Sequence, residues 1–387
     1  MINKKVYTSL ILKTINDLIQ NMTIQNSSKI LFYFILFTIC FSCKKEAETA
    51  KPEIITPEIA VRNFKKSLYQ NEIDSIFKKN NFNGSIAVFQ DSILLSRKES
   101  GFEDFTLKTP ISENTIFAIG SISKQFTTVM ILKQTEAQKL NLQDFVSKFL
   151  PEFQTPKFEK ISVEQLMNHT SGISDSGNGL QSKPGEKFNY SNKGFYFLGK
   201  ILEKASGKSY DENARELFQL AGLHQTFTAE NFAGNNFGGA HTGNEKNVQK
   251  IENMPKRLAD KSISVAAGGI LSTINDLHLW NQKLYGGKII NPENLQKFLA
   301  QSAERAHPIF GKMGYGLGIM MTMGNPKSFF HSGYVKGSPS LNVYYPETKT
   351  SVIILSNIAD ETKGKTAFFK PHQEMKNFAD KVEMVSM

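Results

Sequence analysis

Apolar and polar positions alternate along both ends of the chain and recur with helical spacing in its middle. A period of two predicts a hairpin over residues 84–101 and strands over 313–323, 328–331, 341–345 and 351–356. Spacings of three and four predict helices over residues 59–79, 121–137, 162–169, 195–207, 209–220 and 272–285, and another near the C-terminus. Residues 231–250, rich in glycine and asparagine, are expected to form an exposed loop.

This order of elements predicts an α+β fold. Strands from both ends of the chain would join one antiparallel sheet flanked by helices, with a mostly helical insertion over about residues 125–270. The sequence shows no internal repeat and no break in composition, so residues 58–387 are expected to form a single domain. The 387 residues are 40% apolar and 21% charged, which is ordinary for a globular protein.

The positive charge of the chain does not favour nucleic acid as a partner. The formal net charge is +10, and four lysines and one aspartate among the first 42 residues contribute +3 of it. The remaining +7 is scattered along the chain without a basic block, so these charges are expected on a solvated surface. No nucleic-acid partner is predicted.

The N-terminal segment has the features of an export signal. Residues 30–41 form an apolar run interrupted only by Thr38, which is too short to span a bilayer but suits the core of a signal peptide. Residues 1–42 are therefore expected to be a leader, with Met22 as an alternative start. A plain secretory signal and an uncleaved anchor are the alternatives.

The end of this leader, Ile39–Cys43, resembles a bacterial lipobox, with Cys40 where leucine is commonest. The resemblance implies that Cys43 carries a lipid and begins the mature chain, with residues 43–57 as a tether. Both cysteines lie in this region, so the rest of the chain cannot form an internal disulfide. We therefore expect an exported lipoprotein of the cell envelope, attached to the membrane through the lipid on Cys43.

Ser121 and Lys124 are the first candidates for chemistry. Their spacing at the start of a predicted helix places both side chains on one face of its first turn. An amine beside a hydroxyl can take its proton, and the free N–H groups at a helix N-terminus can stabilise an oxyanion. The same spacing recurs at Ser42–Lys45 and Ser75–Lys78, and a serine cap followed by a solvated lysine is the ordinary alternative.

Two tripeptides could complete such a site. Tyr190-Ser191-Asn192 precedes a predicted helix, and His331-Ser332-Gly333 ends a predicted strand. Serine chemistry requires a second proton carrier for the leaving group, which a tyrosine can supply. Each residue also has a structural alternative: Tyr190 as a packed aromatic, Asn192 as a helix-start residue and His331 as a half-buried histidine.

Together with Ser121-Ile122-Ser123-Lys124, these tripeptides resemble the motifs of the serine β-lactamase and penicillin-binding-protein superfamily, in its class C-like branch. Other segments similar to this superfamily are Leu166–Ile173, Pro184–Asn192, Gly268–Thr273 and Tyr315–Gly318. The sequence lacks the S-D-N and K-T-G motifs of class A β-lactamases. Its Tyr-x-Asn and His-x-Gly motifs resemble those of class C-like enzymes and of the related D-aminopeptidases and esterases. The resemblance extends over residues 73–357 and implies the β-lactamase and D,D-peptidase fold.

The resemblance implies catalytic roles for three residues and a binding role for a fourth. Ser121 is the expected nucleophile, which attacks a carbonyl and forms an acyl-enzyme. Lys124 helps to deprotonate it, and Tyr190 carries the proton to the leaving group. Asn192 is expected to hydrogen-bond either the substrate or Lys124.

The resemblance also implies residues at the oxyanion and substrate side of the site. The backbone N–H groups of Ser121 and Tyr334 are expected to form the oxyanion hole. Gly333 is expected to let the substrate lie close to its strand, and His331 is expected beside the substrate. His169 matches a structural turn of the superfamily.

His331 stands where true β-lactamases carry a lysine. Histidine is largely neutral at pH 7, so the substitution favours an esterase or peptidase over efficient β-lactam hydrolysis. We therefore expect an envelope serine hydrolase that acts through an acyl-enzyme on an ester, an amide or a D-amino-acid-containing peptide. A class C-like β-lactamase and a catalytically silent module that binds peptidoglycan or another ligand are the alternatives. No metal or other cofactor is predicted, because the sequence has no H-x-H-x-D or H-E-x-x-H pattern.

Overall fold

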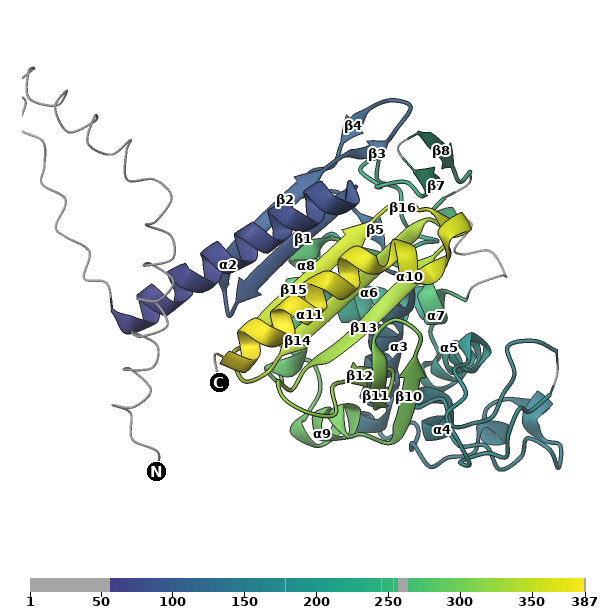
Figure 1. Ribbon diagram of the computed structural model, residues 1–387. Helices are drawn as coiled ribbons and strands as arrows, with labels where there is room; N and C mark the ends of the chain where they lie inside the picture. Colours follow the sequence, from purple (N-terminus) through teal and green to yellow (C-terminus); the bar gives the residue numbers. More distant parts are fainter. Residues whose placement is uncertain (1–55, 178, 245, 253, 257–263, 386–387) are drawn as a thin grey trace, which may run out of the picture. The chain divides into compact units, whose positions relative to one another are not determined.

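The computed structural model describes residues 56–385 except 178, 245, 253 and 257–263 (Figure 1). The predicted leader, Cys43 and nearly all of the tether lie outside the described residues. None of the helices in the described ranges is long and apolar enough to cross a membrane.

An eight-stranded sheet forms the centre of the described chain, in the order β10-β11-β12-β13-β14-β15-β1-β2. Every neighbouring pair is antiparallel. Strand β1 pairs with β15 from Gly84 opposite Ser356 to Gln90 opposite Thr350, so both ends of the chain build one sheet, as the sequence predicts. In chain order the strands are β1 (Gly84–Gln90), β2 (Ile93–Ser100), β10 (Ala303–His307), β11 (Gly311–Tyr315), β12 (Met320–Met321), β13 (Phe329–Val335), β14 (Ser338–Tyr345) and β15 (Thr350–Ser356).

Helices cover both faces of this sheet because alternate strand residues point to opposite sides. In β1, Ile86 and Val88 join the apolar cluster of helices α2 (Pro57–Asn80) and α11 (Lys370–Val385). Ala87 and Phe89 join the larger cluster, which contains the apolar residues of the helices between residues 123 and 299. Figure 1 shows α2 and α11 in front of the sheet, with α3 (Ser123–Glu136) and α8 (Ile274–Tyr285) behind it. Coverage on both faces explains why the central strands are apolar almost throughout.

The helical insertion predicted between the two groups of strands is present, and its helices have strong end signals. Ser162 and Ser209 each begin a helix with a capping box, and Gly207 ends another in the left-handed conformation. The helical elements are α3 (Ser123–Glu136), α4 (Val163–Met167), α5 (Asn192–Ser206), α6 (Tyr210–Ala221), α7 (Val265–Gly268), α8 (Ile274–Tyr285), α9 (Pro292–Leu299) and α10 (Gly364–Phe368), with the 3-10 turns η1 (Gly120–Ile122), η2 (Val146–Lys148), η3 (Pro151–Phe153) and η5 (Glu361–Lys363).

Two sequence predictions about secondary structure were wrong, and two elements were not predicted. The expected loop over residues 231–250 contains a hairpin, which forms because backbone pairing to a third short strand compensates for its polar sequence. The expected strand over residues 313–323 is interrupted after Tyr315, where Gly318 takes a φ of +72°. Strand β10 and helix α9 were not predicted at all. The remaining short strands are β3 (Phe102–Asp104), β4 (Thr109–Pro110), β5 (Phe117–Ala118), β6 (Phe227–Thr228), β7 (His241–Asn244), β8 (Asn247–Lys250), β9 (Ile270–Ser272) and β16 (Ile358–Ala359).

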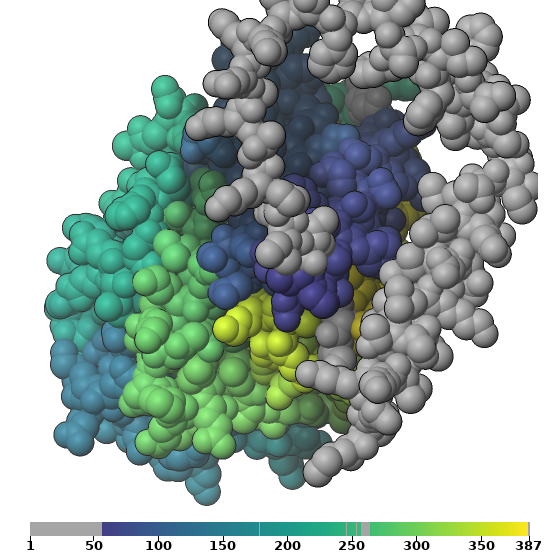
Figure 2. Space-filling model, turned by 90° about the vertical axis from the view of Figure 1, so that its left-hand side faces the viewer, coloured from purple at the N-terminus to yellow at the C-terminus, as the bar shows by residue number. Residues whose placement is uncertain are grey.

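A buried ion pair joins the first and last described helices. The Lys65 ammonium on α2 lies 3.1 Å from the Glu383 carboxylate on α11, and only 4% and 1% of the two side chains are exposed. The hydroxyls of Tyr69 and Thr350 also donate to this carboxylate, at 2.7 and 3.2 Å. Figure 2 shows α2, in purple, beside the yellow C-terminal segment. The pair therefore fixes α2 against α11 and the sheet.

Removing one partner of this pair is expected to destabilise the fold. Glu383→Ala should lower the free energy of unfolding by about 3–5 kcal/mol, because the Lys65 charge stays buried without its partner. The double variant Lys65→Met/Glu383→Leu should recover most of that loss. Urea unfolding measures the free energy of unfolding of both variants. The control is Glu293→Ala, because Glu293 forms an exposed pair with Lys297, and this variant should lose less than about 1 kcal/mol. Equal losses for the Glu383 variant and this control would contradict the prediction.

Candidate active site

The backbone around Ser121 is positioned by direct packing of η1 on strand β13. Gly120 has a φ of +51°, and a Cβ on it would lie 2.5 Å from the backbone nitrogen of Tyr334. A Cβ on Gly333 would lie 2.0 Å from the carbonyl oxygen of Ile119. Neither position has room for a side chain, so the two glycines let the turn that carries Ser121 lie against the backbone of Tyr334.

The structure gives a different reason for the glycine at position 333 from the one expected from the sequence. The sequence interpretation assigned its missing side chain to close approach of a substrate. In the structure Gly333 is buried, and the group that needs the space is the carbonyl of Ile119. The turn also places Ser121 just before α3 instead of inside its first turn.

Lys124 occupies the first turn of α3 and is fully buried. Its Nζ lies 3.1 Å from Ser121 Oγ, 2.8 Å from Asn192 Oδ1 and 2.8 Å from the carbonyl oxygen of Ala267. The ring of Phe195 lies on another side of the amine, with its centroid 5.2 Å away. Three segments that are distant in sequence therefore meet at one amine.

Tyr190 completes the arrangement that the sequence predicts. Its phenol O–H donates to Ser121 Oγ at 2.8 Å. The Lys124 Nζ lies 4.9 Å from the centroid of the same ring. Ser121 and Tyr190 are each partly exposed, whereas Lys124 has no exposed surface. Ser121 therefore lies at a partly exposed position, with an amine and a phenol both within hydrogen-bonding reach of its hydroxyl.

The pKa values of the amine and the phenol are both below their ordinary values. Burial lowers the pKa of Lys124, against the attraction of Tyr190 and Asp175. Burial alone raises the pKa of the Tyr190 phenol, but the positive charges of Lys124 and Arg305, with the hydrogen bond to Ser121, outweigh it. Both shifts bring proton transfer to and from Ser121 closer to neutral pH.

Asp175 orients Asn192, a role that sequence reasoning missed. Its carboxylate accepts hydrogen bonds from Ser191 Oγ at 2.8 Å and from the backbone N–H groups of Asn192 and Lys193 at 3.1 and 3.0 Å. These are the donors at the start of α5, where a negative charge is favourable. The only signal in the sequence was an acidic residue just after the Leu166–Ile173 segment.

A chain of hydrogen bonds between uncharged groups runs behind Tyr190. The Ser191 N–H donates to His169 Nδ1 at 3.1 Å, so a neutral His169 ring carries its proton on Nε2. This Nε2 lies 3.1 Å from the Tyr315 hydroxyl, which can accept that proton in a hydrogen bond. That hydroxyl lies 3.1 Å from His331 Nε2, and His331 Nδ1 lies 2.7 Å from the carbonyl of Ser332. Each donor meets an acceptor when both histidines are neutral. Burial lowers the pKa of each far below its ordinary value.

His331 therefore differs from its predicted place beside the substrate. Its side chain has no exposed surface, and both ring nitrogens are engaged by Tyr315 and by the Ser332 carbonyl. His169 agrees with the structural turn expected of it, since its φ is +61°. The two histidines support the site from behind and bring no charge to it.

Arg305 is the positively charged side chain beside this site that the sequence interpretation missed. It lies on strand β10, and its guanidinium carbon is 4.4 Å from the centroid of the Tyr190 ring and 5.8 Å from that of Phe188. The side chain is partly exposed. The side chains of Ala303, Arg305 and His307 alternate with more exposed ones, which is the pattern of a strand. The strand has only five residues, so this alternation was too weak to predict it.

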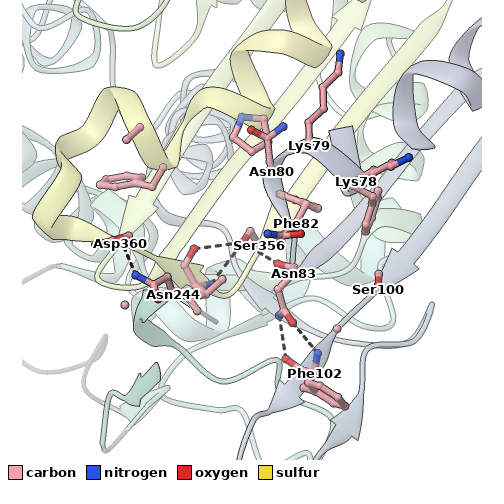
Figure 3. A pocket seen from close by; sticks show the side chains of 18 of the residues that line it. Lys78, Lys79, Asn80, Phe82, Asn83, Ser100, Phe102, Asn244, Ser356 and Asp360 are labelled. Carbon is pink, nitrogen blue, oxygen red and sulfur yellow. Dashed lines mark hydrogen bonds between the residues drawn. The ribbon is translucent and has the colours of Figure 1, made fainter. Parts of the chain in front are cut away.

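A separate cavity of about 680 Å³ opens between the C-terminal end of α2, strand β2 and α10 (Figure 3). Its labelled side chains include Lys78, Phe82 and Asn83, and Asn244 donates to Asp360 at 3.1 Å. None of the residues predicted for the Ser121 site lines it. Among the described residues no group of three or more His, Cys, Asp or Glu side chains could hold a metal ion.

The sequence comparison agrees with this geometry. The family described as beta-lactamase matches residues 73–369. The chain therefore belongs to the β-lactamase family and is a serine hydrolase of that family, which confirms the predicted resemblance.

The chain is similar in sequence to two curated bacterial proteins. It is 24% identical over 346 residues to a penicillin-binding protein of Bacillus subtilis (strain 168), covering 79% of this chain and 75% of that protein. It is 31% identical over 257 residues to the teichoic acid D-alanine hydrolase of Staphylococcus aureus (strain MRSA252), covering 60% of this chain and 62% of the hydrolase.

Solved structures confirm the predicted fold. The penicillin-binding protein of Bacillus halodurans has a TM-score of 0.68 at 20% identity, covering 79% of this chain and 99% of that chain. The D-amino acid amidase of Ochrobactrum anthropi SV3 has a TM-score of 0.68 at 20% identity, covering 81% of this chain and 98% of that chain.

Proposed function

We propose that this protein hydrolyses esters or amides of D-amino acids through an acyl-enzyme on Ser121. The observation that carries the proposal is the Ser121 hydroxyl, which has the Lys124 amine at 3.1 Å and the Tyr190 phenol at 2.8 Å. A nucleophile with a base and a second proton carrier in direct contact is the arrangement that acyl transfer requires.

The partners of Lys124 indicate which of its protonation states is the base. The carbonyl of Ala267 and Oδ1 of Asn192 can only accept hydrogen bonds, so a neutral amine uses both its protons there. Its lone pair then points at Ser121 Oγ and can take the hydroxyl proton. The lowered pKa of Lys124 increases the fraction of this neutral form at a given pH.

The proposed reaction has two halves. Ser121 Oγ gives its proton to Lys124 and attacks the carbonyl carbon, while the carbonyl electron pair moves to oxygen. The backbone N–H groups of Ser121 and Tyr334 stabilise that oxyanion. The oxyanion collapses, the bond to the leaving oxygen or nitrogen breaks, and Tyr190 supplies the leaving atom with a proton. Water then gives a proton to the Tyr190 phenolate, and its oxygen attacks the acyl carbonyl. The bond from the acyl carbon to Ser121 Oγ breaks, the Lys124 ammonium returns its proton to Oγ, and the D-amino acid is released.

The relatives support D-amino acids as the acyl part of the substrate. One curated relative is a teichoic acid D-alanine hydrolase, and one structural relative is a D-amino acid amidase. Efficient β-lactam hydrolysis is less well supported, because a buried neutral His331 stands where β-lactamases carry lysine.

Ser121→Ala is expected to abolish hydrolysis and covalent labelling. The wild-type protein should gain one adduct with a fluorophosphonate in intact-protein mass spectrometry and should release D-alanine from D-alanyl esters. Ser121→Ala should do neither, while Ser67→Ala, at an exposed serine of α2, should behave as wild type. An adduct that persists in Ser121→Ala would remove the nucleophile assignment, and nitrocefin turnover faster than that of the D-alanyl ester would replace the substrate class.

The acylation rate is expected to rise with pH through the pKa of Lys124. Only the neutral amine can accept a proton, and burial holds its pKa below 10.5, so the midpoint should lie below that value. Lys124→Arg keeps the charge but has no neutral form in this range, so kcat/KM should fall about 10²–10⁴-fold and the rising limb should disappear. Lys133→Arg, on the same helix, is the control. An unchanged pH profile in Lys124→Arg would assign the base to another group.

We also propose that the protein is anchored at the cell envelope through a lipid on Cys43. The support is the lipobox-like sequence Ile39–Cys43 after an apolar run. Cys43→Ala should move the protein from the membrane pellet to the soluble fraction, with Cys40→Ala as the matched control that stays bound. Retention of Cys43→Ala in the membrane would disprove the lipid anchor.

A further inference from the structure

Arg305 lies at the edge of the Ser121 site on the outermost strand of the sheet. In the part of the chain that the structure describes, β10 pairs with β11 alone, and Arg305 lies opposite Met313. The neighbours Glu304 and Ala306 are exposed, whereas Arg305 is partly buried, so its side chain points to the face that carries the site.

The guanidinium contacts an aromatic ring and a sulfur atom. It lies over the Tyr190 ring, and its Nη1 is 3.5 Å from Met320 Sδ. Among the described residues, no carboxylate forms an ion pair with it, whereas Arg97 pairs with both Glu99 and Glu113. A partly buried arginine with unused donors is suited to bind an anion.

Two other charged side chains at the site, Lys124 and Asp175, already have hydrogen-bond partners in the protein. The Lys124 amine is fully buried and contacts three oxygen atoms of the protein. The Asp175 carboxylate is held by donors at the start of α5. The neighbouring histidines His169 and His331 are neutral. Arg305 is therefore a positive charge without an acidic partner among the described residues, and it lies against the partly exposed Tyr190.

We propose that Arg305 binds a negatively charged group on the leaving part of the substrate. This inference rests on the proposed function, in which Tyr190 protonates the leaving atom, because the guanidinium lies against the Tyr190 ring. The preferred substrates are then D-aminoacyl esters or amides whose released alcohol or amine carries a phosphate or a carboxylate. Both anions match the fork of donors that a guanidinium presents.

The test compares D-alanyl esters that differ only in the charge of the alcohol. The substrates are the esters of glycerol, of glycerol phosphate and of 3-hydroxypropanoate, and the measured quantity is kcat/KM. The wild-type protein should prefer an anionic ester over the glycerol ester. Arg305→Gln should reduce that preference about 10- to 100-fold, and Arg305→Lys should restore part of it. The phosphate and carboxylate esters show which anion is recognised.

Lys312→Gln is the matched control, because it removes one positive charge from the adjacent strand, where Lys312 pairs with Glu304 at 2.8 Å. Its ester preference should equal that of the wild type. If Arg305→Gln lowers kcat/KM equally for charged and neutral esters and also shifts the pH profile, the proposal is overturned. Arg305 would then act only by lowering the pKa of Tyr190. Absence of any anionic preference in the wild type would also overturn it.

A separate measurement distinguishes failure of this inference from failure of the proposed function. If the wild type cleaves p-nitrophenyl acetate but no D-alanyl ester, the proposed acyl group is wrong. Inhibition of that acetate hydrolysis by glycerol phosphate still tests Arg305, since Arg305→Gln should weaken the inhibition at least tenfold and Lys312→Gln should not. Identical inhibition constants in wild type and Arg305→Gln would reject the anion site whatever the substrate.

Discussion

The interior position of one amine determines the geometry of this site. An amine without water must find its hydrogen-bond partners in the protein, because an unpaired buried polar group is strongly unfavourable. Lys124 meets this requirement with oxygens from Ser121, Asn192 and Ala267, which belong to η1, α5 and α7. The requirement that stabilises the amine therefore also brings the nucleophile to it. The same loss of water makes the amine easier to deprotonate.

Two further constraints keep that geometry rigid. The contact between η1 and β13 has no room for side chains at Gly120 or Gly333, so the turn cannot rise from the strand without losing its packing. Behind Tyr190, neutral His169, Tyr315 and neutral His331 link the α5 side of the site to β13. Because these links involve no ionised group, burial does not weaken them in the way that it weakens isolated charges. A site held from both sides in this way is preorganised for chemistry.

The sequence was informative where a function depends on local spacing. The three-residue step from Ser121 to Lys124 and the period of the strands could be recognised in the sequence, and the family motifs added Tyr190. Asp175 and Arg305 were missed because their roles arise from contacts between segments far apart in the chain. The buried environment of His331 was missed for the same reason, since residue type gives the chemistry of a ring but not its exposure.

The pairing of β1 with β15 has a consequence for the order of events during synthesis. Gly84 pairs with Ser356, so the central sheet stays incomplete until the chain has been made as far as Ser356. Contacts of such long sequence separation also slow folding, because a large loop must close before they form. A nascent or prematurely terminated chain would thus present an unpaired edge at β1, and this edge is where premature association between chains would begin.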